Sequence, residues 1–121
     1  VRDLTTGLVE LGLLQGEVEE LIESDAYRRF YLHSTSHWLG LDVHDVGSYR
    51  EAGEPRPLVP GMVLTIEPGL YIPQDGDIPA EYRGIGIRIE DDVAVTSKGP
   101  DVLSKGLVKE PDAIEALMQS G

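Results

Sequence analysis

Residues 62–71 read MVLTIEPGLY, and residues 85–95 read IGIRIEDDVAV. Both runs are rich in β-branched and apolar side chains, which is the composition of strands. The first run is broken at Pro68-Gly69, and a loop rich in Pro, Gly and Asp (residues 73–84) joins the two. The two runs therefore predict the central strands of a sheet.

Helical patterns flank this predicted sheet. Apolar residues recur at helical spacing over residues 1–14, and a second helix follows Gly16. Near the other end, Pro111 suits the first position of a short helix over residues 111–119. Alternation of apolar and polar residues predicts a further strand over residues 39–44. With helices at residues 1–27 and a sheet-forming segment at residues 36–105, the sequence predicts an α+β fold with an antiparallel or mixed sheet.

The composition excludes several classes of function. With 22 acidic and 10 basic residues, the net charge is −12, and such a surface repels the phosphate backbone of nucleic acids. No apolar run approaches the roughly 20 residues that span a bilayer, so we expect a soluble, cytoplasmic protein with no membrane partner. There is no cysteine, so any metal must bind to nitrogen and oxygen donors, which suits Mn, Zn, Co or Mg.

All three histidines lie within twelve residues, at His33, His37 and His44. Such clustering beside glycines that allow close backbone approach favours a functional site. On a helix, His33 and His37 would share one face and could hold zinc. The intervening residues 34–36 are Ser, Thr and Ser, which are poor in helix interiors, and the acid-base Glu of that zinc motif is absent. The helical zinc motif is therefore disfavoured.

Two glutamates interrupt the strand runs. A carboxylate such as Glu67, within an apolar strand, is costly to bury unless it is paired; the alternative is an edge strand from which it faces solvent. In the second run Glu90 shares a face with Arg88. These two form either a surface ion pair or a metal-bound carboxylate steadied by a neighbouring cation. One imidazole and two carboxylates suffice for one catalytic metal with an open position, and are too few to hold two metals securely.

Three segments resemble the motifs of one enzyme family. Residues 31–47, YLHSTSHWLGLDVHDVG, resemble the histidine motif of bacterial Xaa-Pro aminopeptidase (aminopeptidase P). Residues 60–71, PGMVLTIEPGLY, and residues 84–92, GIGIRIEDD, resemble the two glutamate motifs of the same family, in the same order. The resemblance covers nearly the whole chain and implies the C-terminal half of a pita-bread catalytic domain, the fold shared with methionine aminopeptidase, prolidase and creatinase.

The resemblance also implies roles for single residues. His37, Glu67 and Glu90 would be metal ligands, with Glu90 bridging two divalent ions, usually manganese, although cobalt or zinc also suit this set. Glu67 would also accept the proton of the metal-bound water or hydroxide. The remaining implied site residues are His33 and His44, which would orient the peptide and stabilise charge at the scissile carbonyl, Arg88, which would support the ligand carboxylates, and Tyr71, which would line the site. The implied reaction is hydrolysis of the bond between an N-terminal residue and a following proline.

One departure from the family pattern is large. The family's metal site also requires two aspartates on earlier strands, whereas only Asp3 and Asp25 precede His33, both in predicted helices. The chain also begins at Val1, without an initiator Met or a signal peptide. We therefore expect a C-terminal fragment whose partner is the N-terminal part of the same protein. Alone, it is expected to bind manganese weakly and to hydrolyse nothing, and the full-length protein is expected to be a homo-oligomer.

Three alternatives remain open at this point. Prolidase shares the ligands and prefers dipeptides, and Trp38 favours the aminopeptidase only weakly, because prolidases tend to carry Phe there. A non-catalytic pita-bread binding module is disfavoured, because every ligand expected in this half is present. A structural half-domain that associates with a partner polypeptide is the third alternative.

Overall fold

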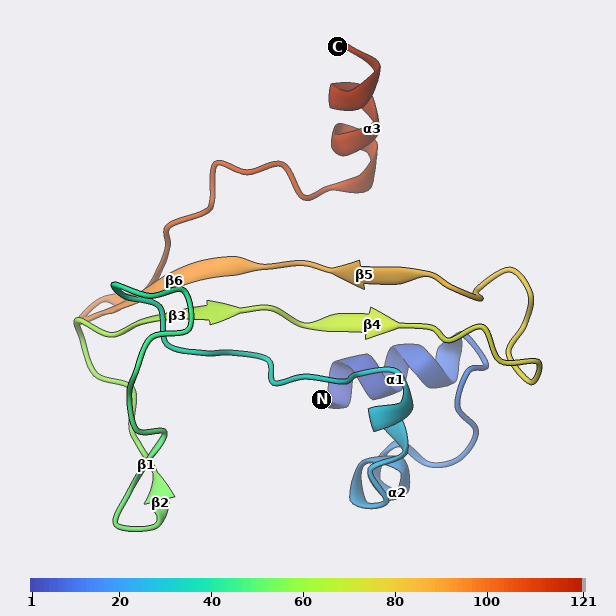
Figure 1. The fold of residues 1–121 in the computed structure, drawn as a ribbon, viewed down its shortest axis with the longest axis horizontal. Coiled ribbons are helices and arrows are strands. Elements are labelled where there is room, and N and C mark those ends of the chain that lie inside the picture. Colours follow the sequence, from blue (N-terminus) through green and yellow to red (C-terminus); the bar gives the residue numbers. More distant parts are fainter. Residues whose placement is uncertain (121) are drawn as a thin grey trace. The chain divides into compact units, whose positions relative to one another are not determined.

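The structure, a computed structural model, describes residues 1–120 and divides into two compact units (Figure 1). The first unit contains Val1–His33 and Gly69–Arg88, and the second contains Ser34–Pro68 and the residues from Ile89 onward. Each unit combines helix with antiparallel strands, which confirms the predicted α+β class. Among the described residues, no helix is long and apolar enough to cross a membrane.

The first unit carries a two-stranded sheet and three helical segments. Its elements are α1 (Arg2–Glu10), α2 (Val18–Glu23), the 3-10 helix η1 (Ala26–Arg29), β4 (Gly69–Tyr71) and β5 (Gly86–Arg88). Helix α1 ends before residue 14 because Gly12 adopts a left-handed φ of 71°. The amides of Gly12 and Leu13 then donate to the carbonyls of Val9 and Leu8 at 3.0 and 2.9 Å. This is a Schellman ending, which satisfies the last carbonyls of the helix.

The core of the first unit joins α1, η1 and the strand pair. Leu8 and Phe30 are fully buried, and Ile72 and Ile78 are nearly so. The amide of Tyr71 donates to the carbonyl of Phe30 at 2.8 Å, so the end of β4 is fixed to the end of the helical segments. Strands β4 and β5 pair antiparallel, with Leu70 opposite Ile87 (Figure 1).

The second unit is built on a three-stranded antiparallel sheet in the order β3-β6-β7. Its elements are β1 (Arg50–Glu51), β2 (Glu54–Pro55), β3 (Val63–Ile66), β6 (Asp91–Thr96), β7 (Gly99–Val102) and α3 (Pro111–Gln119). Strands β1 and β2 form a separate hairpin, whose turn places Ala52 and Gly53 at positive φ (Figure 1). Leu64 and Thr65 are the buried residues of β3. Helix α3 begins at Pro111, where the sequence pattern places a helix start.

Two strand predictions are wrong in detail. The predicted strand at residues 39–44 is a loop, because the amide of Asp45 donates back to the carbonyl of Trp38 at 3.0 Å and that of Gly40 donates to Asp42. The run of residues 85–95 is two strands, with Ile89 and Glu90 outside both. The gap lies opposite Glu67 and Pro68, where the first run is also interrupted, since proline has no amide hydrogen for the ladder. Glu90 therefore does not share one continuous strand face with Arg88.

Candidate metal centre

The histidine segment lies along the free edge of β3. The amide of Leu39 donates to the carbonyl of Val63, and the amides of Thr65 and Glu67 donate to the carbonyls of His37 and Thr35, at 2.7 to 3.1 Å. These bonds form an antiparallel ladder in which His37 is directly opposite Thr65. The extended pairing of this region therefore covers residues 35–39 and precedes the residues predicted as a strand.

Thr65 links two of the predicted ligands through one buried hydroxyl. Its Oγ1 accepts a hydrogen bond from the backbone amide of His37 at 3.1 Å and donates one to Oε1 of Glu67 at 3.2 Å. The residue is only 2% exposed, so no water competes for these bonds. Thr65 and Glu67 are two residues apart, the spacing of one strand face, but nothing in the sequence indicated that the hydroxyl would bridge to His37.

The two glutamates approach each other from neighbouring segments of the sheet, Glu67 just after β3 and Glu90 just before β6. The register of β3 and β6 pairs Ile66 with Asp91, so its next step places Glu67 opposite Glu90. Glu67 is therefore not on a solvent-facing edge, and its side chain is only 12% exposed. Two like charges opposite each other and partly buried repel, and a cation between them removes that repulsion.

His37 completes the cluster. One ligand atom from each of His37, Glu67 and Glu90 lies within 4.8 Å of the others, and all three residues are partly buried. A carbonyl can only accept, so the contact of Nδ1 of His37 with the carbonyl of Trp38 at 3.0 Å places the proton on Nδ1. Nε2 then faces Oε1 of Glu67 at 3.1 Å. An imidazole fixed through one nitrogen, with the other directed at carboxylates, fits a divalent cation ligand.

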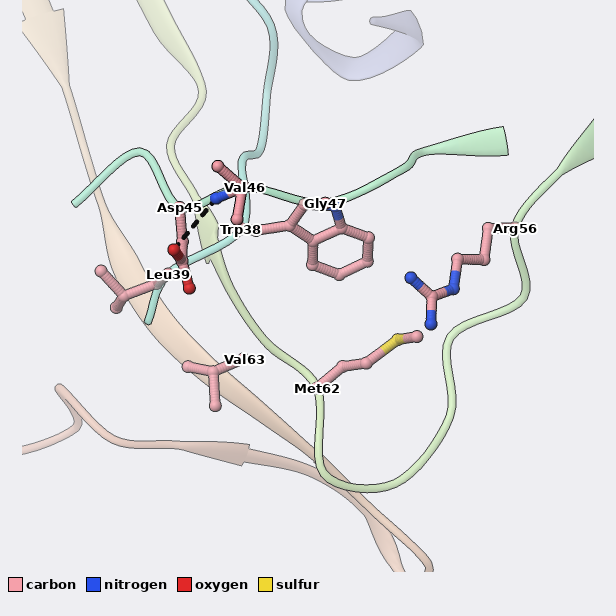
Figure 2. A pocket seen from close by; sticks show the side chains of 8 residues that line it. All are labelled: Trp38, Leu39, Asp45, Val46, Gly47, Arg56, Met62 and Val63. Atoms are coloured by element: carbon pink, nitrogen blue, oxygen red, sulfur yellow. Dashed lines mark hydrogen bonds between the residues drawn. The ribbon is translucent and has the colours of Figure 1, made fainter. Parts of the chain in front are cut away.

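Trp38 also lines a cavity of about 180 Å³ in the second unit (Figure 2). Its ring stacks on Tyr49, with centroids 5.4 Å apart and planes 7° apart, and the Arg56 guanidinium lies 6.0 Å from its centroid. A Cβ at Gly47 would lie 2.6 Å from the indole Cδ1, so only glycine fits beside the ring. These contacts fix the indole, and with it the carbonyl that orients His37. The other lining residues are Leu39, Asp45, Val46, Met62 and Val63.

The other predicted site residues fall in both units. In the second unit, the exposed His44 ring meets the His37 ring edge-on, with centroids 4.3 Å apart. In the first unit, Nε2 of His33 lies 2.8 Å from the hydroxyl of Tyr71, and their rings are also in edge contact. Arg88 is exposed at the end of β5. The structure thus brings His44 to the side-chain cluster of His37, Glu67 and Glu90, and it pairs His33 with Tyr71.

Replacing Thr65 by Val is expected to weaken binding of a divalent ion by roughly 10- to 100-fold, the usual effect of losing a group that orients a ligand. The substitution conserves the shape of the side chain and removes only the hydroxyl that joins His37 to Glu67. Calorimetric titration of the full-length protein with Zn²⁺ or Mn²⁺ measures the change. Thr65→Ser is the control, because it keeps the hydroxyl and should retain most of the affinity. Equal losses in both variants would contradict a role for the hydroxyl.

Comparison with known proteins places these features in one family. The profile of metallopeptidase family M24 matches residues 4–97. The Xaa-Pro aminopeptidase of Escherichia coli (strain K12) is 58% identical over 118 residues, which cover 98% of this chain and 26% of that protein.

Solved structures agree with the sequence match. The chain superposes on the aminopeptidase PepP of Pseudomonas aeruginosa with a TM-score of 0.95 at 56% identity, covering 98% of this chain and 27% of that one. It superposes on a Zn-substituted E. coli aminopeptidase P in complex with product with a TM-score of 0.91, also at 56% identity and with the same coverage of both chains. The chain spans about a quarter of the length of these relatives.

Proposed function

The chain belongs to metallopeptidase family M24, and we propose that it is the C-terminal part of the catalytic domain of an Xaa-Pro aminopeptidase. The full-length protein would release the N-terminal residue of peptides that have proline in the second position. The observation that carries the proposal is the cluster of His37, Glu67 and Glu90, whose ligand atoms lie within 4.8 Å of one another. The relatives that match at 56–58% identity support it, since they are named Xaa-Pro aminopeptidase, aminopeptidase PepP and aminopeptidase P.

The donor set suits hard or borderline divalent cations. Nε2 of His37 and the carboxylates of Glu67 and Glu90 would hold the ions, with Glu90 bridging two of them. We propose manganese as the native metal, and the Zn-substituted E. coli relative supports the same site accepting zinc. When bound, such ions polarise the scissile carbonyl and lower the pKa of water. Three side chains do not complete two coordination spheres, and the two aspartates expected from the family pattern are proposed as further ligands.

The protein groups around the ions have separate tasks. Glu67 is proposed to take the proton of the attacking water, since its side chain is 12% exposed and one of its oxygens is already held by Thr65. His44 lies against His37, where it would orient the peptide or donate to the developing oxyanion. His33 is proposed to do the same in concert with Tyr71, its hydrogen-bond partner. Arg88 is proposed to support the ligand carboxylates.

The remaining proposals concern the whole protein. Its substrate partner would be a peptide with proline second, in keeping with the Xaa-Pro aminopeptidase of E. coli that is 58% identical to this chain. We propose that the full-length protein is a cytoplasmic homo-oligomer that contains the two aspartate ligands expected from the family pattern. Nucleic acid is not proposed as a partner, given the net charge of −12.

Peptide hydrolysis by the full-length protein tests the proposal. With Mn²⁺ present, an Xaa-Pro-Xaa peptide should be cleaved after its first residue, and an Xaa-Ala-Xaa peptide should react roughly 10- to 200-fold more slowly, the range that a shaped pocket provides. Removing the metal with a chelator should abolish the activity, and adding Mn²⁺ should restore it. Preference for the Xaa-Pro dipeptide would instead identify a prolidase. A protein that hydrolyses neither peptide, and whose biological activity survives His37→Ala, would be a binding module.

A further inference from the structure

A side-chain cluster that includes the residue after Glu90 joins two parts of the second unit that are distant in sequence. Nζ of Lys109 lies 2.8 Å from Oδ1 of Asp91, and the hydroxyl of Ser104 donates to the same carboxylate oxygen. Nζ of Lys109 also donates to the carbonyl of Ser104 at 3.4 Å. We call these three residues, Asp91, Ser104 and Lys109, the lysine clip. It connects the first residue of β6 with the segment that leads from β7 to α3.

Backbone contacts extend the clip. The hydroxyl of Ser104 accepts a hydrogen bond from the amide of Asp92 at 3.1 Å, and the amide of Leu103 donates to the carbonyl of Asp92 at 2.8 Å. Ser104 therefore contacts two successive residues at the start of β6 with one oxygen. These bonds continue the pairing of β7 with β6 beyond the last ladder pair, Val93 with Val102.

The clip is more than a loose surface ion pair. The side chains of Lys109 and Asp91 are 26% and 28% exposed, whereas the neighbouring pair of Lys105 and Asp101 is 77% and 55% exposed and 3.6 Å apart. Hydrogen bonds from Lys109 and then Ser104 lower the pKa of the Asp91 carboxyl. Pairs that are partly withdrawn from water and share several hydrogen bonds fix geometry better than exposed ones.

The lysine clip is next in sequence to one of the candidate metal ligands. Asp91 directly follows Glu90, and Glu90 lies in the gap between β5 and β6, outside both strands. Anchored residues flank Glu90 on both sides: the amide of Ile89 donates to the carbonyl of Pro68 at 3.3 Å, and Asp91 begins the paired residues of β6. On one side, Asp91 pairs with Ile66 of β3; on the other, the clip holds it to the segment after β7.

We propose that Lys109 and Ser104 are positioning residues that hold Glu90 in place for metal binding, acting through Asp91. This inference rests on the proposed function, because it takes Glu90 as a metal ligand. The side chains of Lys109 and Ser104 bond to Asp91, and Ser104 also accepts from the amide of Asp92. Their effect is to restrict the start of β6, so that the Glu90 carboxylate stays opposite Glu67.

The test uses the full-length protein and three lysine variants. Lys109→Met removes the ammonium and keeps much of the length, Lys109→Arg keeps the charge, and Lys105→Met is the matched control, because it removes an exposed pair in the same segment. Calorimetry with Mn²⁺ alone should show affinity reduced about 10-fold or more in Lys109→Met, the range for a lost orienting group. Affinity should be largely retained in Lys109→Arg and unchanged in Lys105→Met.

A metal-free measurement separates this inference from the proposed function. Amide hydrogen exchange of the peptide that covers residues 86–93 should be faster in Lys109→Met than in the parent protein, and unchanged in Lys105→Met. If the parent protein shows no Mn²⁺ binding that depends on His37, the proposed function fails, whatever the exchange rates. If the parent binds Mn²⁺ and Lys109→Met binds it equally well, or if exchange near Glu90 is unchanged, the positioning role is wrong while the proposed function stands.

Discussion

Replacing Glu67 by Gln in the full-length protein should lower kcat/KM for an Xaa-Pro-Xaa peptide by about 10²- to 10⁴-fold, the usual contribution of a general base. The substitution keeps the size and planarity of the side chain but removes its negative charge. It also directs an amide group toward Nε2 of His37, which lies 3.1 Å from Oε1 of the native carboxylate. Metal content should fall as well, because a neutral amide is a weaker ligand for a hard cation.

Steady-state kinetics and metal analysis of the purified protein measure both effects. Glu115→Gln is the matched control, because this glutamate is exposed on α3 and the same change in charge should leave kcat/KM unaltered. Activity of Glu67→Gln within about 10-fold of the parent, well short of the loss expected on removing a general base, would mean that another group takes the proton.

The second large effect concerns stability and falls on the first unit. Phe30 is fully buried in a core with Leu8, Ile72 and Ile78. Phe30→Ala should lower the free energy of unfolding by about 3–5 kcal/mol, because it removes a large side chain and leaves a cavity. Such a loss is a large part of the 5–15 kcal/mol typical of a folded domain.

Thermal and urea unfolding of the full-length protein, with metal present, report this loss. Leu32→Ala is the control, since Leu32 is 69% exposed and its truncation should change stability by no more than about 0.5 kcal/mol. Equal shifts for Phe30→Ala and Leu32→Ala would show that the core of the first unit does not limit stability.

Local sequence patterns indicated those features of the fold and of the site that depend on residues close together in the sequence. The carboxylate of Glu67 within an apolar run indicated either a partner for that charge or a solvent-facing edge, and the structure places it against His37 and the hydroxyl of Thr65. Pro68 predicted the interruption of its strand, because a proline in the run removes a ladder hydrogen bond.

Features that depend on distant pairing were not predictable from these patterns. Alternation over residues 39–44 is typical of a strand, but the edge of β3 is instead occupied by residues 35–39. Which segment covers that edge is decided by tertiary contacts, such as the stacking of Trp38 on Tyr49. The contact of Lys109 with Asp91 spans the whole β6-β7 hairpin, and a lysine in a polar segment gives no signal of it.

With the proposed metal bound between them, the apposition of Glu67 and Glu90 would link the supply of metal to the lifetime of the folded protein. An ion that binds the native site and not the unfolded chain adds RT ln(1 + [L]/Kd) to stability, or about 2.7 kcal/mol at a free concentration one hundred times Kd. The midpoint of thermal unfolding should therefore rise with the logarithm of free metal concentration. In a cell that is starved of the metal, the loss of activity would then be accompanied by faster proteolytic turnover, because the unfolded fraction increases.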